Sequence, residues 1–233
     1  MARVAASLVI PAYDEERGLE AVLESLAAAA IEGLEVIVVD DGSTDGTAKV
    51  AERYGVRLVS HPVNRGKGTA VQSGLAVASA PKVIVMDADD TYPIAAIPRL
   101  LELLETNDHV RGSRRIGRKN IPPLNRLGNA LIRLSLRLAF GVQSADPLTG
   151  LYALRTVELR RMNLTSPGYG LETEIAIKSS RMRLRTIDHP IAYGARLGRS
   201  KLSPLRDGIV IARTILGQVW PRLRSRSKYP QVD

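Results

Sequence analysis

Four short aliphatic segments in the first half of the chain constrain its fold more than any other feature. They occupy residues 7–10, 34–39, 56–59 and 83–86, and each is largely apolar on both faces. Segments with apolar residues at helical spacing separate them, at 19–30, 48–54 and 67–78. Strands that are apolar on both faces, alternating with helices, are typical of a parallel sheet covered on both sides. The sequence therefore predicts an α/β fold.

The second half is less regular. Its pattern predicts helices over 94–104, 124–140, 172–182 and 206–223. It also predicts three strands. One begins at Val110, one covers 152–154, and one covers 185–193 and is split by Pro190. No internal repeat is present, and the tail from Arg224 onward has a composition typical of disorder.

Acidic residues follow two of the aliphatic segments directly. Asp40 and Asp41 follow the second, while Asp87, Asp89 and Asp90 follow the fourth. Because open parallel sheets bind ligands beyond the carboxyl ends of their strands, we expect these acids to converge. Carboxylates are hard ligands, so such a cluster suits Mg²⁺ or Mn²⁺ that also holds a diphosphate. The alternative is a strand that runs into a solvated acidic turn.

Charge is distributed unevenly along the 233 residues, whose net charge is +9. The stretch 111–144 holds eight Lys or Arg residues and no acid, and 196–228 holds nine against a single Asp. This asymmetry indicates an anionic partner for the second half, or else a solvated basic face. Cysteine is absent, which excludes disulfides, thiolate metal sites and cysteine nucleophiles, and which fits a cytoplasmic location.

A glycine-rich turn at 64–69 places Lys67 between two glycines at the start of a helix. It is not a Walker A loop, because the required first glycine is replaced by His61, and it lacks the third glycine of a dinucleotide fingerprint. Lys67 at a helix start can still meet a nucleotide phosphate or base. The alternative is a tight turn with a solvated lysine. The three histidines lack metal-ligand spacing, and we expect surface or satisfied turn positions for them.

Several motifs, in order, resemble those of family 2 glycosyltransferases. The segments 9–16, 38–47, 64–68 and 86–89 match its first strand and loop, its nucleoside-binding motif, and the motifs that follow. The likeness is specific to the dolichyl- or polyprenyl-phosphate glycosyltransferase branch. Later segments agree with it, namely 112–114, 146–152, 170–174 and 196–202. The resemblance covers the chain to about Leu216.

The resemblance implies a GT-A nucleotide-diphosphosugar transferase fold, with a mostly parallel central sheet and helices on both faces. It divides the domain at 1–216 into a nucleotide-binding half, 1–106, and an acceptor-binding half, 107–205. Residues 206–233 then form a C-terminal amphipathic helix and a basic tail. In this helix apolar residues at 209–220 alternate with Arg213. It lies in a membrane interface or packs on the domain.

The resemblance also implies a donor site. Asp87 and Asp89 are expected to bind the divalent metal that bridges the donor diphosphate. Branch members often have a Gln ligand where this chain has Thr91, which becomes the candidate third metal ligand. The residues expected to hold the nucleotide-diphosphosugar are Pro11, Tyr13, Glu15, Asp40, Asp41, Lys67 and Asp87, with a closing loop of Arg199, Ser200 and Lys201.

On the acceptor side, members that use hydroxyl acceptors carry an Asp base where this chain has Thr173. Its absence favours a phosphate acceptor, which is already ionised near pH 7 and needs no base. Glu172 or Glu174 could replace that base, or the two glutamates could favour the start of a helix. Arg114 and Arg126 match arginines that hold the acceptor phosphate. The expected catalytic residues are Asp89, Arg114 and Glu172.

These expectations define a metal-dependent inverting transferase, which moves a hexose from a GDP- or UDP-sugar (GDP-mannose or UDP-glucose) to a polyprenyl phosphate, dolichyl or undecaprenyl. The chain shows no secretory signal and no apolar segment of membrane-spanning length, so we expect a cytoplasmic protein, peripheral at the inner face of the cell membrane. Alternatives are a soluble phosphorylated or hydroxyl acceptor, and a non-catalytic nucleic-acid or lipid-surface binder. No nucleic-acid partner is expected. Four further basic residues suit membrane-surface attraction or solubility: Arg118, Lys119, Arg133 and Arg137.

Overall fold

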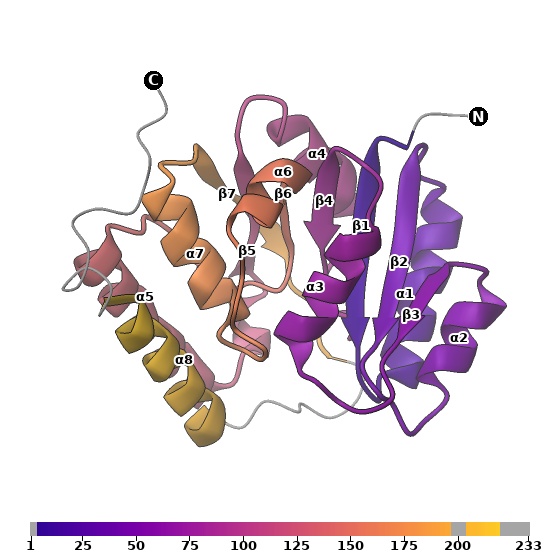
Figure 1. The fold of residues 1–233 in the computed structure, drawn as a ribbon, viewed down its shortest axis with the longest axis horizontal. Helices are drawn as coiled ribbons and strands as arrows, with labels where there is room; N and C mark the ends of the chain where they lie inside the picture. Colours follow the sequence, from indigo (N-terminus) through magenta and orange to yellow (C-terminus); the bar gives the residue numbers. More distant parts are fainter. Residues whose placement is uncertain (1–3, 197–203, 220–233) are drawn as a thin grey trace.

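A computed structural model describes residues 4–196 and 204–219 of the chain (Figure 1). Its centre is a seven-stranded sheet in the order β3-β2-β1-β4-β6-β5-β7. Every neighbouring pair is parallel except β4–β6 and β5–β6, so β6 alone runs against the rest. The strands are β1 (Ala6–Ala12), β2 (Leu34–Asp40), β3 (Arg57–Ser60), β4 (Lys82–Val85), β5 (His109–Ile116), β6 (Tyr152–Arg155) and β7 (Thr186–Ala192).

Helices cover both faces of this sheet (Figure 1). The mostly parallel sheet with helices on both faces, expected from the sequence, is confirmed. The helices are α1 (Glu16–Ala29), α2 (Thr47–Arg53), α3 (Lys67–Val77), α4 (Ile97–Leu103), α5 (Pro123–Phe140), α6 (Thr156–Arg161), α7 (Leu171–Arg181) and α8 (Pro204–Val219), with the short 3₁₀ turns η1 (Ile94–Ala96) and η2 (Arg118–Asn120).

Alternation along each strand separates two apolar cores. In β1, Leu8 and Ile10 face one core with residues from α1, α2 and α4, while Val9 faces the other with residues from α3, α6 and α7. All three side chains have no exposed surface. This explains why the aliphatic segments are apolar at nearly every position, because a strand buried on both faces has no outward side.

A third, smaller cluster joins α5, α7 and α8 at one end of the molecule (Figure 1). Leu136 and Phe140 of α5 meet Ile177 of α7, and the partly buried Ile215 of α8 packs against them. The C-terminal helix therefore packs on the domain through one face. None of the helices within the described residues is both long and apolar enough to cross a membrane.

Two local features differ from the sequence-based expectations. The short helix α6 was not predicted, and Pro190 does not split the last strand, because β7 runs through it. β7 is the edge of the sheet, where a residue without an N–H is tolerated, and the β5–β7 register shifts between Ser113 and Ile116. The two expected halves share one sheet, since β4 of the first pairs with β6 of the second.

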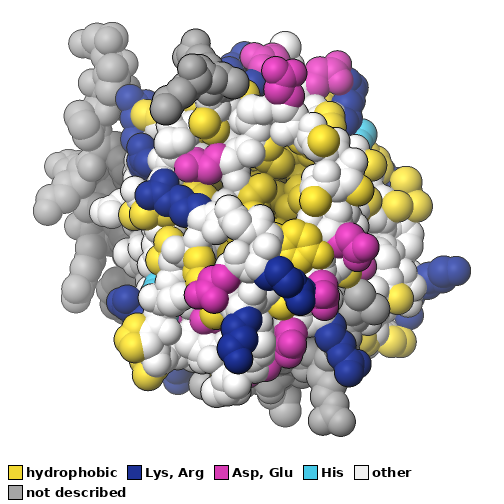
Figure 2. Space-filling view, turned by 90° about the vertical axis from the view of Figure 1, so that its right-hand side faces the viewer, with side chains coloured by type: hydrophobic (Ala, Val, Ile, Leu, Met, Phe, Trp, Pro, Cys, Tyr) yellow, Lys and Arg dark blue, Asp and Glu magenta, His cyan; other side chains and the backbone are white. Residues whose placement is uncertain are grey.

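The opposite edge of the sheet, at β3, has no excess of one charge. Figure 2 shows this end of the molecule, where Lys and Arg side chains are interspersed with Asp and Glu around an apolar area. Such a mixture of charges is ordinary for a solvent-exposed protein surface. The basic excess of the second half is therefore not gathered at this end.

Candidate active site

The carboxyl ends of β1, β2 and β4 bring three turns together at one edge of the sheet. Ala12 is paired with Asp40 in register, and the N–H of Asp41 donates to the carbonyl of Ala12 at 2.8 Å. The turn after β1 is tied to the turn after β2, since the N–H of Asp14 donates to the Ser43 hydroxyl at 2.9 Å. Pro11 is paired with Val39 and Ala12 with Asp40, so the turn that carries Tyr13 and Glu15 starts next to the end of β2.

Lys67 lies at the centre of this edge between two carboxylates. Its Nζ is 2.6 Å from Oδ1 of Asp87 and 2.5 Å from Oε1 of Glu172. Burial by itself lowers the pKa of Lys67, but the charges of Asp87 and Glu172 raise it well above its usual value. The lysine therefore carries its positive charge near neutral pH, and the alternative of a solvated lysine in a tight turn does not hold.

Asp89 is buried deeper, with 3% of its surface exposed. Its Oδ1 accepts hydrogen bonds from the hydroxyl of Thr91 at 2.6 Å and from the Thr91 N–H at 3.2 Å. Its Oδ2 is 3.3 Å from Nη2 of Arg196, which is also 2.9 Å from Oε1 of Glu15. Thr91 donates both of these hydrogen bonds and so orients the Asp89 carboxylate, while its expected role as a metal ligand stays a prediction.

These contacts test whether a divalent cation fits here. The ion-paired side chains comprise four carboxylates (Glu15, Asp87, Asp89, Glu172) and two cations (Lys67, Arg196), which leaves two negative charges unbalanced. No group of three or more His, Cys, Asp or Glu side chains in the described part of the chain is arranged to hold a metal ion. Mg²⁺ typically binds one or two carboxylates together with substrate phosphates, and the hard oxygens of Asp87 and Asp89 fit that arrangement.

Asp41 supports the glycine-rich turn from within. Its Oδ1 accepts from the Arg65 N–H at 2.9 Å, and its Oδ2 accepts from the Gly66 N–H at 2.7 Å. The buried His61 ring lies 2.6 Å from the same carboxylate and 2.9 Å from the Ser73 hydroxyl. Asp41 was expected to contact the nucleotide, but its oxygens are committed to the turn that carries Lys67. His61 is a satisfied turn residue, as expected.

Glu172 and Glu174 take different roles although both begin α7. Glu174 has no exposed surface and accepts from the N–H groups of Thr165 and Ser166, at 3.0 Å and 2.8 Å, and it pairs with Lys178. It holds the loop before α7 and cannot serve as a base. Thr173 is also fully buried, and its hydroxyl has no partner. Glu172 alone among these three points into the site.

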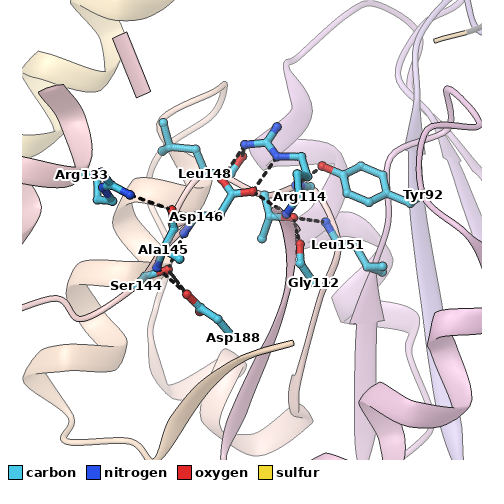
Figure 3. A network of polar contacts seen from close by, with 12 residues as sticks. Tyr92, Gly112, Arg114, Arg133, Ser144, Ala145, Asp146, Leu148, Leu151 and Asp188 are labelled. Carbon is cyan, nitrogen blue, oxygen red and sulfur yellow. Dashed lines mark hydrogen bonds and ion pairs between the residues drawn. The ribbon is translucent and has the colours of Figure 1, made fainter. Parts of the chain in front are cut away.

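Arg114 lies on β5, and the loop after α5 holds its side chain through hydrogen bonds (Figure 3). Its Nε and Nη2 each lie 2.7 Å from an oxygen of Asp146, and Nη2 also donates to the Leu148 carbonyl at 3.1 Å. Its guanidinium lies over the ring of Tyr193, 5.5 Å from the centroid. Such a two-pronged pair fixes the direction of the guanidinium fork.

Tyr92 joins the turn after β4 to the loop that holds Arg114. Its hydroxyl accepts from the N–H of Gly150 at 2.7 Å, next to Arg114 (Figure 3). A side chain at Gly150 would overlap the Asp87 carboxylate, which shows how closely this loop approaches the acids. Arg126 is half-buried in the first turn of α5. Arg199, Ser200 and Lys201 lie outside the described residues.

Sequence reasoning missed two members of the site, Arg196 and Asp146. Both lie inside segments already noted, 196–202 and 146–152, but their partners are distant in sequence. Glu15 and Arg196 are 181 positions apart, so no local spacing could have paired them.

Comparison with known proteins agrees with this geometry. The Glycosyl transferase family 2 profile matches residues 7–160. The chain belongs to glycosyl transferase family 2. It is a glycosyltransferase with a GT-A fold, as its sequence motifs implied.

Two curated relatives cover nearly the whole length. A dolichyl-phosphate hexose transferase of Haloferax volcanii is 31% identical over 212 residues, which are 90% of this chain and 92% of the relative. An undecaprenyl-phosphate mannosyltransferase of Micrococcus luteus is 34% identical over 239 residues, with 94% and 97% covered. The branch-specific resemblance of the motifs is therefore confirmed.

Among solved structures, glucosyl-3-phosphoglycerate synthase of Mycobacterium tuberculosis is similar. Its complex with phosphoglyceric acid superposes with a TM-score of 0.73 at 28% identity, covering 93% of this chain and 80% of that one. A second complex of the same protein holds Mn²⁺, uridine diphosphate and the glucosylated product, with a TM-score of 0.70 and 28% identity over 96% and 81% of the two chains. Divalent metal use therefore occurs in structures of this fold.

Proposed function

We propose that this glycosyltransferase moves a hexose from a nucleoside-diphosphate sugar to a polyprenyl phosphate at a membrane surface. The observation that carries the proposal is the pairing of Glu172 with Lys67. It removes the carboxylate best placed to act as a base, and so favours an acceptor that is already ionised. The relatives named for dolichyl and undecaprenyl phosphate support the same class of acceptor.

On the donor side, Asp87 and Asp89 would hold a Mg²⁺ or Mn²⁺ ion. When bound, the metal supplies charge stabilisation for the leaving nucleoside diphosphate. Lys67, held as a cation between Asp87 and Glu172, adds positive charge at the same edge. Thr91 keeps the Asp89 carboxylate in one orientation through its hydrogen bonds. Pro11, Tyr13 and Asp40 line the neighbouring strand ends, where the nucleoside would lie.

On the acceptor side, an ionised phosphate oxygen would attack the anomeric carbon and displace the nucleoside diphosphate with inversion. A phosphate nucleophile needs no proton removed, which suits a site whose Thr173 is buried and whose Glu174 is committed to the loop before α7. Arg114 would bind the phosphate, because Asp146 holds its guanidinium in a fixed direction. Arg126 is the second candidate for that contact.

Membrane contact is the remaining part of the proposal, and it is supported by an exposed face of α5. Five leucines recur at intervals of three and four residues, which places them on one side of the helix. Their exposed fractions run from 52% to 78%, although apolar side chains of this size are usually buried. We call Leu124, Leu127, Leu131, Leu134 and Leu138 the leucine stripe.

The leucine stripe lies opposite the side of α5 that packs on the domain through Leu136 and Phe140. Basic residues of the same helix flank it, namely Arg126, Arg133 and Arg137. An apolar face with flanking positive charge is the pattern of a helix that lies in a lipid interface. The sequence pointed to the C-terminal helix for this role, whereas the larger exposed apolar surface is on α5, with Ile209 and Leu216 of α8 in addition.

A soluble phosphorylated acceptor is the second candidate. It is favoured by the likeness to a solved synthase that was crystallised with phosphoglyceric acid. Its reaction also uses a charged acceptor, so the donor chemistry does not separate the two functions. The leucine stripe does, because an enzyme with a soluble acceptor has no need of an exposed lipid-binding face.

The test is a transfer assay with radiolabelled GDP-mannose or UDP-glucose, Mn²⁺, and either undecaprenyl phosphate in detergent or 3-phosphoglycerate. We expect label to enter the organic phase with the lipid acceptor. Asp89→Asn should lower turnover at least about 100-fold. The matched control is Asp90→Asn, which removes the neighbouring charge at a positive φ of 58° that Asn tolerates, and which should keep most activity. Label found only in the aqueous product would overturn the lipid acceptor in favour of the soluble one.

A further inference from the structure

Arg196 contacts a carboxylate oxygen that would need to be free for a metal ion to bind it. Its Nη2 bridges Oδ2 of Asp89 at 3.3 Å and Oε1 of Glu15 at 2.9 Å. The other oxygen of Asp89 is already taken by Thr91. The oxygen that Asp89 could offer a cation is therefore the one that Arg196 now faces.

The same guanidinium is incompletely satisfied in this position. Its Nε is buried and has no hydrogen-bond partner. A buried donor without a partner costs free energy, because it has lost water and gained nothing in return. The contact of Arg196 with Asp89 is therefore an ion pair that the Nε–H does not support with a hydrogen bond. A cation of higher charge can displace the guanidinium from this contact.

A divalent ion and this guanidinium compete for Asp89 Oδ2. Both would lie against the same carboxylate oxygen, and the two positive charges would repel each other within a few ångströms inside a largely buried site. Asp87 is less affected, because its partner Lys67 is also anchored by Glu172. The competition therefore concerns Asp89 and Arg196 in particular.

We propose that Arg196 is a resident counter-cation of the donor site, which neutralises Asp89 and Glu15 until a divalent metal binds and displaces it. The inference rests on the proposed metal role of Asp89. It adds that the strength of metal binding is set by an arginine that is not a metal ligand. Removal of Arg196 should therefore strengthen binding of the metal alone, even if it weakens transfer.

The test measures Mn²⁺ binding without nucleotide, from the loss of the free-ion electron paramagnetic resonance signal, in the wild type and in Arg196→Gln. We expect the Kd for Mn²⁺ to fall about tenfold in this variant. The matched control is Arg17→Gln, which removes the same charge from an exposed position at the start of α1 and should leave the Kd within about twofold of wild type. An unchanged or weaker affinity in Arg196→Gln would overturn the inference.

A second measurement does not depend on that variant folding. In wild-type protein with ¹⁵N-labelled arginine, the Nε–H resonance of Arg196, assigned by its absence in Arg196→Lys, should shift on addition of Mg²⁺. It should not shift in Asp89→Asn. A resonance that ignores Mg²⁺ while the metal binds would contradict displacement. If neither the wild type nor Arg196→Gln binds Mn²⁺, even in the presence of a nucleoside diphosphate, then the proposed metal site itself is wrong, and not only this inference.

Discussion

At the scale of single residues, the partner of a charged group decides its role more than its place in a motif does. Glu172 and Glu174 are two positions apart in one helix. Glu172 faces Lys67 at the strand ends, while Glu174 accepts hydrogen bonds from Thr165 and Ser166 and is closed to substrate. Asp41 likewise belongs to the motif that suggests nucleotide binding, but it holds the glycine-rich turn.

His109 carries a prediction about pH. It was expected at the surface or in a satisfied turn, but it begins β5 with only 1% of it exposed, and its Nδ1 lies 3.0 Å from the Ser179 hydroxyl. Burial, helped by the nearby charge of Arg111, lowers its pKa well below the ordinary value. Below about pH 6.5 the unfolded chain therefore binds a proton that the folded protein refuses.

The contribution of His109 to stability is thus fully present above about pH 6.5. It is lost as the pH falls, at about 1.4 kcal/mol per unit until the lowered pKa is reached. Urea unfolding between pH 7.5 and 5 measures this slope. His109→Gln should flatten it, and His189→Gln, at a partly exposed histidine, should not. Equal slopes in the two variants would show that His109 does not remain neutral in the fold.

At the scale of elements, glycines decide how closely helices approach the site. Gly18 of α1 lies against the turn that carries Asp89, since a Cβ there would overlap the Ala88 carbonyl. Gly68 of α3 lies under the loop at 165–168, where a Cβ would overlap the Ser166 carbonyl. Lys67 is adjacent to Gly68, so the fit of α3 under this loop also sets the position of the lysine.

Gly68→Ala should therefore destabilise the protein by about 1–3 kcal/mol, because backbone must move to admit the methyl group. Gly128→Ala is the same change inside α5, where nothing lies within 4 Å of the added atom. It should stabilise by up to about 1 kcal/mol through helix propensity. Denaturant midpoints measure both effects. Stabilisation by Gly68→Ala would show that the loop before α7 is not tightly packed on α3.

At the scale of the whole molecule, one continuous sheet joins the two halves that the sequence predicts to bind donor and acceptor. β6 enters it from the second half and pairs with β4, whose end carries Asp87 and Asp89. The next strand after β6 in the sheet is β5, which carries Arg114. Helix α5 begins shortly after the end of β5. The proposed lipid-binding face on α5 and the candidate active site are thus joined through this sheet and the helices packed on it, which would orient the molecule on a bilayer.

Leu131→Ser with Leu138→Ser should weaken binding to vesicles containing phosphatidylglycerol at least about tenfold. Each exposed leucine that enters the lipid interface contributes on the order of 1.5 kcal/mol or more. Co-sedimentation measures the binding. Val157→Ser removes an exposed apolar side chain from α6 instead, and should change little. Transfer to a short-chain acceptor in detergent should persist in all variants. Unaltered sedimentation of the double variant would remove the leucine stripe as the membrane contact.

The sequence alone determined the α/β class, the family and the order of the motifs, because strand and helix periodicities and short motifs are properties of neighbouring residues. It also pointed to Asp87, Asp89 and Lys67 as candidate site residues, which the fold places at one edge of the sheet. The tertiary structure decided that Lys67 joins Asp87 to Glu172, that Arg196 faces Asp89, and that the exposed apolar face belongs to α5. These facts depend on pairings between distant segments, and only packing of the whole chain brings such segments to hydrogen-bonding distance.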